Sequence, residues 1–270
     1  MPDILEKIFQ VKRREVAGLA PRLADFRAAS RDASPPRSLA EALRRASDEP
    51  VRIIAEVKHR SPSAGVIADP FDPVAIARAY EEAGADAISC LTDAEFFGGS
   101  IEHLREIRRA VRLPVLRKDF TLAPVQVYEA RAAGADAILL IAEALELSGI
   151  TDLAGLAAEL DMDVLAEAHS EAALEKALGC GAALVGVNNR DLATFQVRLE
   201  TTERLAPCVR EGDSCGRDAS QRRVLVSESG IQTAADVSRL LACGCHAILV
   251  GEGLLRSGDV AGKLAEFKSV

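Results

Sequence analysis

Charged and amide side chains stand at the ends of short apolar runs in this sequence, where they could carry out acid–base chemistry. The candidates for catalysis are Glu56, Lys58, Lys118, Glu167, Asn188 and Glu228. A charge beside a buried strand is costly unless it is paired or functional. Acids and bases that lie close together shift each other's pKa, and this prepares them to donate and accept protons. Any one of these residues could be a solvated strand end, but as a set they predict a catalytic site.

A second set of small residues is suited to binding an anion. It consists of Ser61, Ser229, Gly230, Gly251 and Gly253. Glycine lets backbone N–H groups approach an anion closely, and a helix N-terminus adds partial positive charge. Barrel enzymes often bind phosphate with the loops after their seventh and eighth strands. We therefore predict a phosphate site there, with the side chain of Glu252 turned away from it.

The elements that must position these residues are eight apolar runs alternating with eight helical patterns. The predicted strands are 51–57, 87–91, 114–120, 137–142, 162–168, 183–187, 223–229 and 247–251. The helical patterns lie near 72–83, 100–111, 124–133, 147–160, 170–179, 199–209, 233–243 and 259–269. The motif AGADAI occurs at 83–88 and 133–138, with looser copies at 180–185 and 243–248. Each copy ends a helix with glycine and enters a buried strand.

This alternation predicts an α/β fold, a (β/α)8 TIM barrel with an N-terminal helical extension. An open, doubly wound sheet is the rival, but its glycine-rich G-x-G-x-x-G turn after an early strand is absent. In a barrel, the carboxyl ends of the strands meet at one mouth, so the polar strand ends would converge there.

We predict a single domain over residues 1–270. Residues 1–48 look helical at about 3–17 and 38–46, and this extension is too short to bury a core of its own. The polar stretch 211–223 is predicted to be a flexible surface insertion between the sixth helix and the seventh strand. It accounts for the longer interval before the last copy of the motif.

The composition restricts the kinds of partner that the protein could bind. The formal net charge of −8 argues against a nucleic-acid partner, so an anionic substrate would need a local cationic pocket. No apolar run is long enough for a signal peptide core or a membrane span, which predicts a cytoplasmic protein without a membrane partner. The six cysteines form no CxxC pair and no Cys/His cluster at zinc spacing, which predicts reduced thiols and no metal site.

Several motifs together resemble the indole-3-glycerol phosphate synthase family of tryptophan biosynthesis. They are AEVKHRSPSAG (55–65), FFGGS (96–100), PVLRKDF (114–120), YEARAAGADAILLI (128–141), VLAEAH (164–169), VGVNNRDL (185–192), VSESGI (226–231) and VGEGLL (250–255). The stretch ILEKIFQVKRREV (4–16) resembles that family's additional N-terminal helix. The resemblance covers nearly the whole chain.

The resemblance implies a carboxy-lyase that needs no metal or cofactor. Its substrate would be 1-(2-carboxyphenylamino)-1-deoxyribulose 5-phosphate, whose own carbonyl serves as the electron sink. An aromatic carbon attacks that carbonyl, CO2 leaves, and loss of water forms the indole. By the same resemblance, Lys118 donates a proton to the carbonyl oxygen.

The resemblance also assigns roles to the remaining candidates. Lys58 would pair with the substrate carboxylate or assist dehydration, with Glu56 as its partner and Glu167 as the other catalytic carboxylate. Asn188 and Glu228 would orient hydroxyl groups and catalytic side chains beside Arg190. Phe96 or Phe97, together with Phe120, would line the pocket around the aromatic ring of the substrate. Members are often monomeric, so we expect a monomer, with weak association with other pathway enzymes as a further option.

Two alternatives stay open on the sequence. Phosphoribosylanthranilate isomerase is another phosphosugar barrel. A chain that resembled that family would carry a Cys at the end of the first strand and an Asp at the end of the sixth. This chain has Glu56-Val57-Lys58 and Asn188 there instead. A non-catalytic metabolite-binding barrel is the second alternative, and charged groups at five strand ends argue against it.

Overall fold

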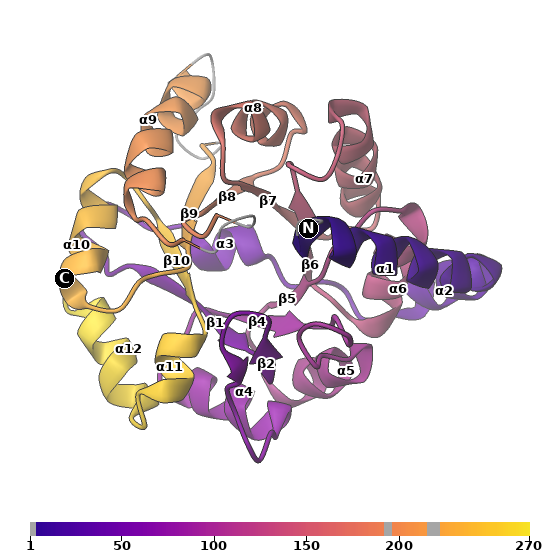
Figure 1. Ribbon diagram of the computed structural model, residues 1–270, viewed down its shortest axis with the longest axis horizontal. Coiled ribbons are helices and arrows are strands. Elements are labelled where there is room, and N and C mark those ends of the chain that lie inside the picture. The colour runs from indigo at the N-terminus through magenta and orange to yellow at the C-terminus, as the bar shows by residue number, and fades with distance from the viewer. Residues whose placement is uncertain (1–3, 192–195, 215–221) are drawn as a thin grey trace.

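A closed barrel of eight parallel strands organises the molecule (Figure 1). The computed structural model describes residues 4–191, 196–214 and 222–270. Around the barrel the strands follow the order β1, β10, β9, β8, β7, β6, β5, β4. They are β1 (Arg52–Val57), β4 (Ala87–Leu91), β5 (Val115–Lys118), β6 (Ala137–Ile141), β7 (Asp163–Ala168), β8 (Leu184–Asn188), β9 (Val224–Glu228) and β10 (Ala247–Val250). The predicted TIM barrel is confirmed.

Helices surround the strands as a ring. They are α4 (Pro73–Glu82), α5 (Ile101–Ala110), α6 (Pro124–Ala133), α7 (Leu147–Glu159), α8 (Glu171–Gly179), α9 (Glu200–Ser214), α10 (Ala234–Ala242) and α12 (Val260–Lys268), with the short α11 (Glu252–Arg256) after β10. Gly134 caps α6 in the left-handed conformation at φ 89°, as its place in the repeated motif predicts. Helix α9 runs past the predicted end at 209, so the predicted insertion begins as helix. Residues 215–221 of that insertion lie outside the described residues.

The strands read as continuous apolar runs because both of their faces are buried. Ile53 and Ala55 of β1 pack outward with the apolar faces of the helices. Ile54, between them, points into the barrel and joins a separate inner cluster with Leu116 and Leu249. Side chains alternate across a strand, so residues two apart share a face. Glu56 therefore shares the inward face of Ile54.

The N-terminal extension contacts both ends of the barrel. Helix α1 (Ile4–Leu19) lies at the carboxyl ends of the strands, which we call the mouth. Helix α3 (Leu39–Leu43) closes the opposite end, where Leu39 and Leu43 are fully buried in the inner cluster. The backbone N–H of Ala40 and the hydroxyl of Ser38 both donate to Asp163 at the start of β7.

Some elements were absent from the sequence prediction, among them α11, the 3-10 helix η1 (Ala20–Arg22), one longer helix and one hairpin. Helix α2 (Leu23–Asp32) packs against α6, with the guanidinium of Arg27 4.9 Å from the ring centre of Tyr128. A small antiparallel hairpin, β2 (Arg60–Ser61) with β3 (Gly65–Val66), forms in the loop after β1. No helix in the described ranges is both long and apolar enough to cross a bilayer.

Candidate active site

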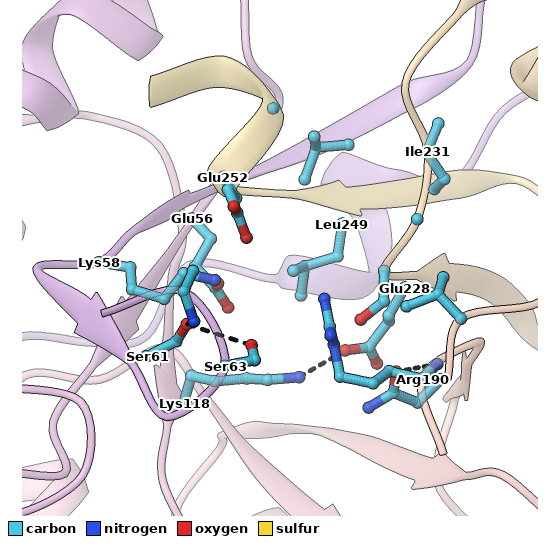
Figure 2. Close-up of a pocket in the computed structure, with 18 of the residues that line it drawn as sticks. Glu56, Lys58, Ser61, Ser63, Lys118, Arg190, Glu228, Ile231, Leu249 and Glu252 are labelled. Atoms are coloured by element: carbon cyan, nitrogen blue, oxygen red, sulfur yellow. Dashed lines mark hydrogen bonds and ion pairs between the residues drawn. The ribbon is translucent and has the colours of Figure 1, made fainter. Parts of the chain in front are cut away.

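Lys118, the last residue of β5, lies at the centre of the mouth and contacts two carboxylates. Its Nζ is 2.8 Å from Oε2 of Glu167 on β7, and it also contacts Oε2 of Glu228 on β9. Both carboxylates are almost completely buried. Figure 2 shows Lys118 extending across the mouth toward Glu228, with Glu56 and Lys58 on one side and Arg190 on the other. Three strands that are distant in sequence thus place one charged cluster on the barrel axis.

The buried charges shift one another's pKa. Burial alone would lower the pKa of Lys118, but the charges of Glu167, Glu228 and Glu56 outweigh it and raise the pKa. Burial would raise the pKa of Glu167, but the charge and hydrogen bond of Lys118 hold it below its ordinary value. For Glu228, burial dominates and, with the nearby charge of Glu167, raises the pKa to about 8. The pKa values of the two carboxyl groups are therefore pushed apart, that of Glu167 downward and that of Glu228 upward, while Lys118 stays charged.

Asn188 connects this cluster to the next loop. Its side-chain amide donates to Oε1 of Glu167 at 3.1 Å, and its Oδ1 accepts from the backbone N–H of Arg190 at 3.0 Å. The ring Nδ1 of His169 lies 2.7 Å from the backbone carbonyl oxygen of Asn188. Asn188 thereby fixes the carboxylate of Glu167 and the start of the segment that carries Arg190.

A second ion pair lies at the end of β1. Nζ of Lys58 is 2.6 Å from Oε1 of Glu56. The two residues are spaced i, i+2, so they share one side of the strand, as predicted. A methyl group on Gly251 would come within 2.9 Å of the same Oε1. Gly251, predicted for phosphate binding, therefore also leaves room for the Glu56 carboxylate.

A cavity of about 1230 Å³ opens over both ion pairs. The predicted site residues that line it are Glu56, Lys58, Ser61, Phe97, Lys118, Phe120, Glu167, Asn188, Arg190, Glu228, Ser229, Gly230, Gly251 and Gly253. Phe96, the other aromatic candidate, is not among the lining residues. Apolar side chains from α1, Ile4, Leu5 and Ile8, form part of the wall beside Phe97 and Phe120. One wall of the cavity is therefore apolar and the floor is charged.

The other wall is built from the loops after β9 and β10. Ser229 and Gly230 both have positive φ, at 69° and 83°, so two successive residues turn the chain in the left-handed region. Gly251 is the N-cap of α11 and Gly253 lies in its first turn. The carboxylate of Glu252 is paired with Arg256 at 3.0 Å, one turn further along. That pairing partly neutralises the acidic side chain that stood next to the predicted phosphate site.

Helix α1 is fastened to the mouth through a buried lysine that the sequence analysis did not single out. Nζ of Lys12 lies 2.8 Å from Asp93, after β4, and 2.8 Å from Asp119, after β5. Asp119 also accepts from Arg117 and Thr92. Burial would raise the pKa of Asp119, but Arg117 and Lys12 hold it at about 2. The residue next to Lys118 is therefore locked in its charged form by the N-terminal helix.

Gly186 is another residue that the analysis of strand ends missed. It lies on β8, and a methyl group there would overlap Oε1 of Glu228. A glycine inside a buried strand was the available signal, since glycine in a strand marks close approach of another group. In the described part of the chain, no group of three or more His, Cys, Asp or Glu side chains is arranged to hold a metal ion.

Comparison with known proteins adds an independent observation. A family model described as indole-3-glycerol phosphate synthase matches residues 5–267. Proteins named indole-3-glycerol phosphate synthase are 46% identical in Roseiflexus sp. over 274 residues, covering 98% of each chain, and in Opitutus terrae over 276 residues, covering 100% of each. The protein of the same name in Chlorobium luteolum is 46% identical over 260 residues, covering 96% of this chain and 95% of its own. These matches extend across the mouth residues and the N-terminal helix alike.

Proposed function

The chain belongs to the indole-3-glycerol phosphate synthase family, and from this premise we propose how its mouth residues divide the work of the reaction. The enzyme is a carboxy-lyase of tryptophan biosynthesis. It converts 1-(2-carboxyphenylamino)-1-deoxyribulose 5-phosphate to indole-3-glycerol phosphate, CO2 and water. Both the family resemblance and the geometry of the mouth support the residue roles that we propose.

Lys118 is the proton donor for ring closure. As the aromatic carbon attacks the carbonyl carbon, negative charge develops on the carbonyl oxygen, and a fixed ammonium group stabilises it most strongly in a site shielded from water. Lys118 meets this need because its raised pKa keeps it protonated and its two carboxylate partners fix its position. Loss of CO2 then restores the aromatic ring.

Glu228 and Glu167 have different roles because their environments separate their pKa values. Glu228 holds a proton at neutral pH and can return one to Lys118 after the first step. Glu167 is charged, and its orientation is set by Lys118 and Asn188. It is therefore the base that removes a proton from the closed ring when water is lost.

The pair of Lys58 and Glu56 serves the later step and the substrate carboxylate. Lys58 can first neutralise the carboxylate that becomes CO2 and then protonate the departing hydroxyl group. Glu56, 2.6 Å away, holds Lys58 in place for both. General acid catalysis of this kind contributes about 10²–10⁴-fold to a rate.

The two walls of the cavity fit the two ends of the substrate. Phe97, Phe120 and Ile8 form an apolar surface for the aromatic ring. Ser229-Gly230 and the first turn of α11 present backbone N–H groups for the phosphate, on the side that barrel enzymes commonly use. Ser61 and Ser63 add hydroxyl groups from the loop after β1.

The observation that carries this proposal is the contact of Lys118 with two buried carboxylates on the barrel axis. We expect Lys118→Ala to lower kcat by about three orders of magnitude, the scale of losing a key electrostatic donor. KM should change little, and the thermal transition should persist. The measurement is indole fluorescence at saturating substrate. Lys268→Ala is the control: Lys268, at the carboxyl end of α12, pairs with Asp86 before β4 at 2.8 Å, so this variant removes an ion pair outside the mouth and should keep its activity. Near-wild-type turnover by Lys118→Ala would refute the assignment.

We also propose that the extension and the barrel form one domain. The support is the buried pairing of Lys12 with Asp93 and Asp119, and the burial of Leu39 and Leu43 inside the barrel. The monomeric state, association with other pathway enzymes and the cytoplasmic location stay predictions.

A further inference from the structure

Two cysteines lie side by side at the end of the barrel opposite the mouth. Cys243 caps the carboxyl end of α10, and Cys245 follows it at the entry to β10. Their Sγ atoms are 4.0 Å apart. A disulfide needs about 2.05 Å, so a rotation of the two side chains that closes about 2 Å would join them. The mouth chemistry uses neither residue.

The backbone between the two thiols is a fixed tight turn. The N–H of Cys245 donates to the carbonyl oxygen of Leu240 at 3.0 Å, and the N–H of Gly244 donates to that of Leu241 at 3.0 Å. Gly244 has φ 95°, the left-handed region that glycine enters without strain. The turn therefore presents both sulfur atoms on the same side without further folding of the chain.

A basic side chain lies against this turn. A methyl group on Gly244 would be 3.3 Å from Cδ and 3.6 Å from Nη1 of Arg210. The S–H of Cys245, acting on the Cys243 sulfur, lowers the pKa of Cys243 and outweighs burial and the charge of Glu203, which raise it. The charge of Arg210 also lowers the pKa, by less. Because the thiolate is the reactive form of cysteine, this environment favours attack by Cys243.

The two thiols differ in their exposure to solvent. A two-step oxidation requires one thiol that the oxidant can reach and a second thiol close to it. Cys243 is partly exposed, whereas Cys245 is buried and lines a second cavity of about 490 Å³. Cys243 is the more exposed of the two thiols, so an oxidant in solution meets it more readily, and Cys245 is the second thiol 4.0 Å away.

The chain holds a natural comparison in its own repeat. Cys180 occupies the same place in 180–185 as Cys243 in 243–248, and both thiols contact the carbonyl oxygen three residues earlier, at 3.2 and 3.1 Å. In that copy, Ala182 stands where Cys245 stands in the other. Burial raises the pKa of Cys180. The second thiol is the main local difference between the two turns.

We propose that Cys243 and Cys245 form a two-electron oxidation site for hydroperoxides, which closes to an intramolecular disulfide. The Cys243 thiolate attacks a peroxide oxygen, the O–O bond breaks, and the departing hydroxide takes a proton to leave as water. The sulfur of Cys245 then attacks the sulfenic acid on Cys243, the S–O bond breaks, and a second water leaves. Two thiols lose two electrons and hydrogen peroxide is reduced to two waters. The site is independent of the synthase reaction.

The test uses the folded, full-length chain treated with hydrogen peroxide, alkylated and digested with trypsin. Trypsin leaves Cys243 and Cys245 together on the peptide 240–256. Cys208 and Cys180 fall on separate peptides, 205–210 and 177–190. We expect the peptide 240–256 to become lighter by two hydrogen atoms and to escape alkylation, at least several-fold faster than Cys208 or Cys180 is oxidised. Dithiothreitol should restore both thiols.

Two variants separate the steps. Cys245→Ser should leave a sulfenic acid on Cys243 that dimedone captures, and Cys243→Ser should abolish the oxidation of this peptide. Three results would overturn the proposal: oxidation of 240–256 no faster than that of the exposed Cys208, sulfinic acid on Cys243 without a disulfide, or a crosslink from Cys243 to a different peptide.

Discussion

At the scale of single residues, the direction of each side chain decides what the mouth can do. Lys118 and Glu228 end β5 and β9, and Glu167 is the last residue but one of β7. All three point inward because side chains alternate along a strand. A shift of pairing by one residue would turn each of them toward the helices. Their meeting on the axis therefore depends on the register of the whole barrel, including the pairing of Asn188 with Glu228 across β8 and β9.

The raised pKa of Glu228 predicts a pH dependence of stability. The folded state binds this proton up to about pH 8, whereas the unfolded chain releases it near the ordinary value of 4.5. The contribution of this group to the free energy of unfolding is therefore fully present below 4.5 and is lost as pH rises through 8. Glu228→Gln stays neutral, so its urea unfolding curves should lack this loss between pH 5 and 9. Parallel pH profiles for the two proteins would contradict the prediction.

Gly186 gives a prediction about positioning. Gly186→Ala places a methyl group against Oε1 of Glu228, which must move, and Lys118 loses a fixed partner. A misplacement of about 1 Å costs on the order of 100-fold in rate, so kcat should fall by about that much. Gly155→Ala on α7, where a methyl group meets open space, is the matched control and should keep its activity. Steady-state kinetics with both variants checks this, and equal rates would show that Glu228 tolerates the shift.

At this scale, the sequence predicted which strand ends carry charge but not the contacts between them. The rule that chemistry lies at the carboxyl ends of barrel strands identified Glu56, Lys118, Glu167 and Glu228. It could not choose between Phe96 and Phe97, because adjacent residues in a turn point in directions that only the loop conformation fixes. The fully buried Lys12 was overlooked since its partners, Asp93 and Asp119, are far from it in sequence.

At the scale of elements, the position of α1 depends on one buried cation. Lys12 is 1% exposed and neutralises Asp93 and Asp119, so its loss would leave two buried carboxylates short of a partner. Breaking a buried pair costs about 3–5 kcal/mol. We expect Lys12→Ala to lower the free energy of unfolding on that scale. KM should rise as well, because α1 supplies Ile4 and Ile8 to the cavity wall.

Arg13→Ala is the control on the same helix. Arg13 is 65% exposed and pairs with Glu6 on the surface, so its removal should change the free energy of unfolding by under about 1 kcal/mol. Urea unfolding and steady-state kinetics compare the two variants. If Lys12→Ala leaves KM as unchanged as Arg13→Ala does, α1 does not form part of the substrate site.

Helix α2 shows where the prediction of elements failed. Among its ten residues only Phe26 and Ser30 are buried, so its apolar periodicity is weak. The helix depends on packing against α6, and the nearby Pro35-Pro36 made the whole connection look irregular. The strands and the barrel helices were predictable because each carries its own apolar pattern, punctuated by the repeated glycine.

At the scale of the molecule, helix α3 packs into the end of the barrel opposite the mouth and stabilises it there. Leu43 of α3 is fully buried in the inner cluster at the closed end. Leu43→Ala should lower the free energy of unfolding by about 2–5 kcal/mol, the usual cost of a cavity left by leucine. The kcat measured at a temperature where the protein stays folded should be unchanged. A reduced kcat would show that the closed end is coupled to the mouth.

The barrel closes where β1 pairs with β10, through partners such as Arg52 and Ala247. During synthesis, one edge of the first strand therefore has no neighbour until the last strand has left the ribosome. Contacts so distant in sequence form slowly, because closing the long loop between them costs chain entropy before the contact itself stabilises the fold. Because β10 pairs with β9, which carries Glu228, and Gly251 follows β10, the surroundings of the proton-transfer cluster and the anion-binding wall are completed in the same late event. A nascent chain halted before β10 would thus carry all six proposed catalytic side chains without forming a working enzyme.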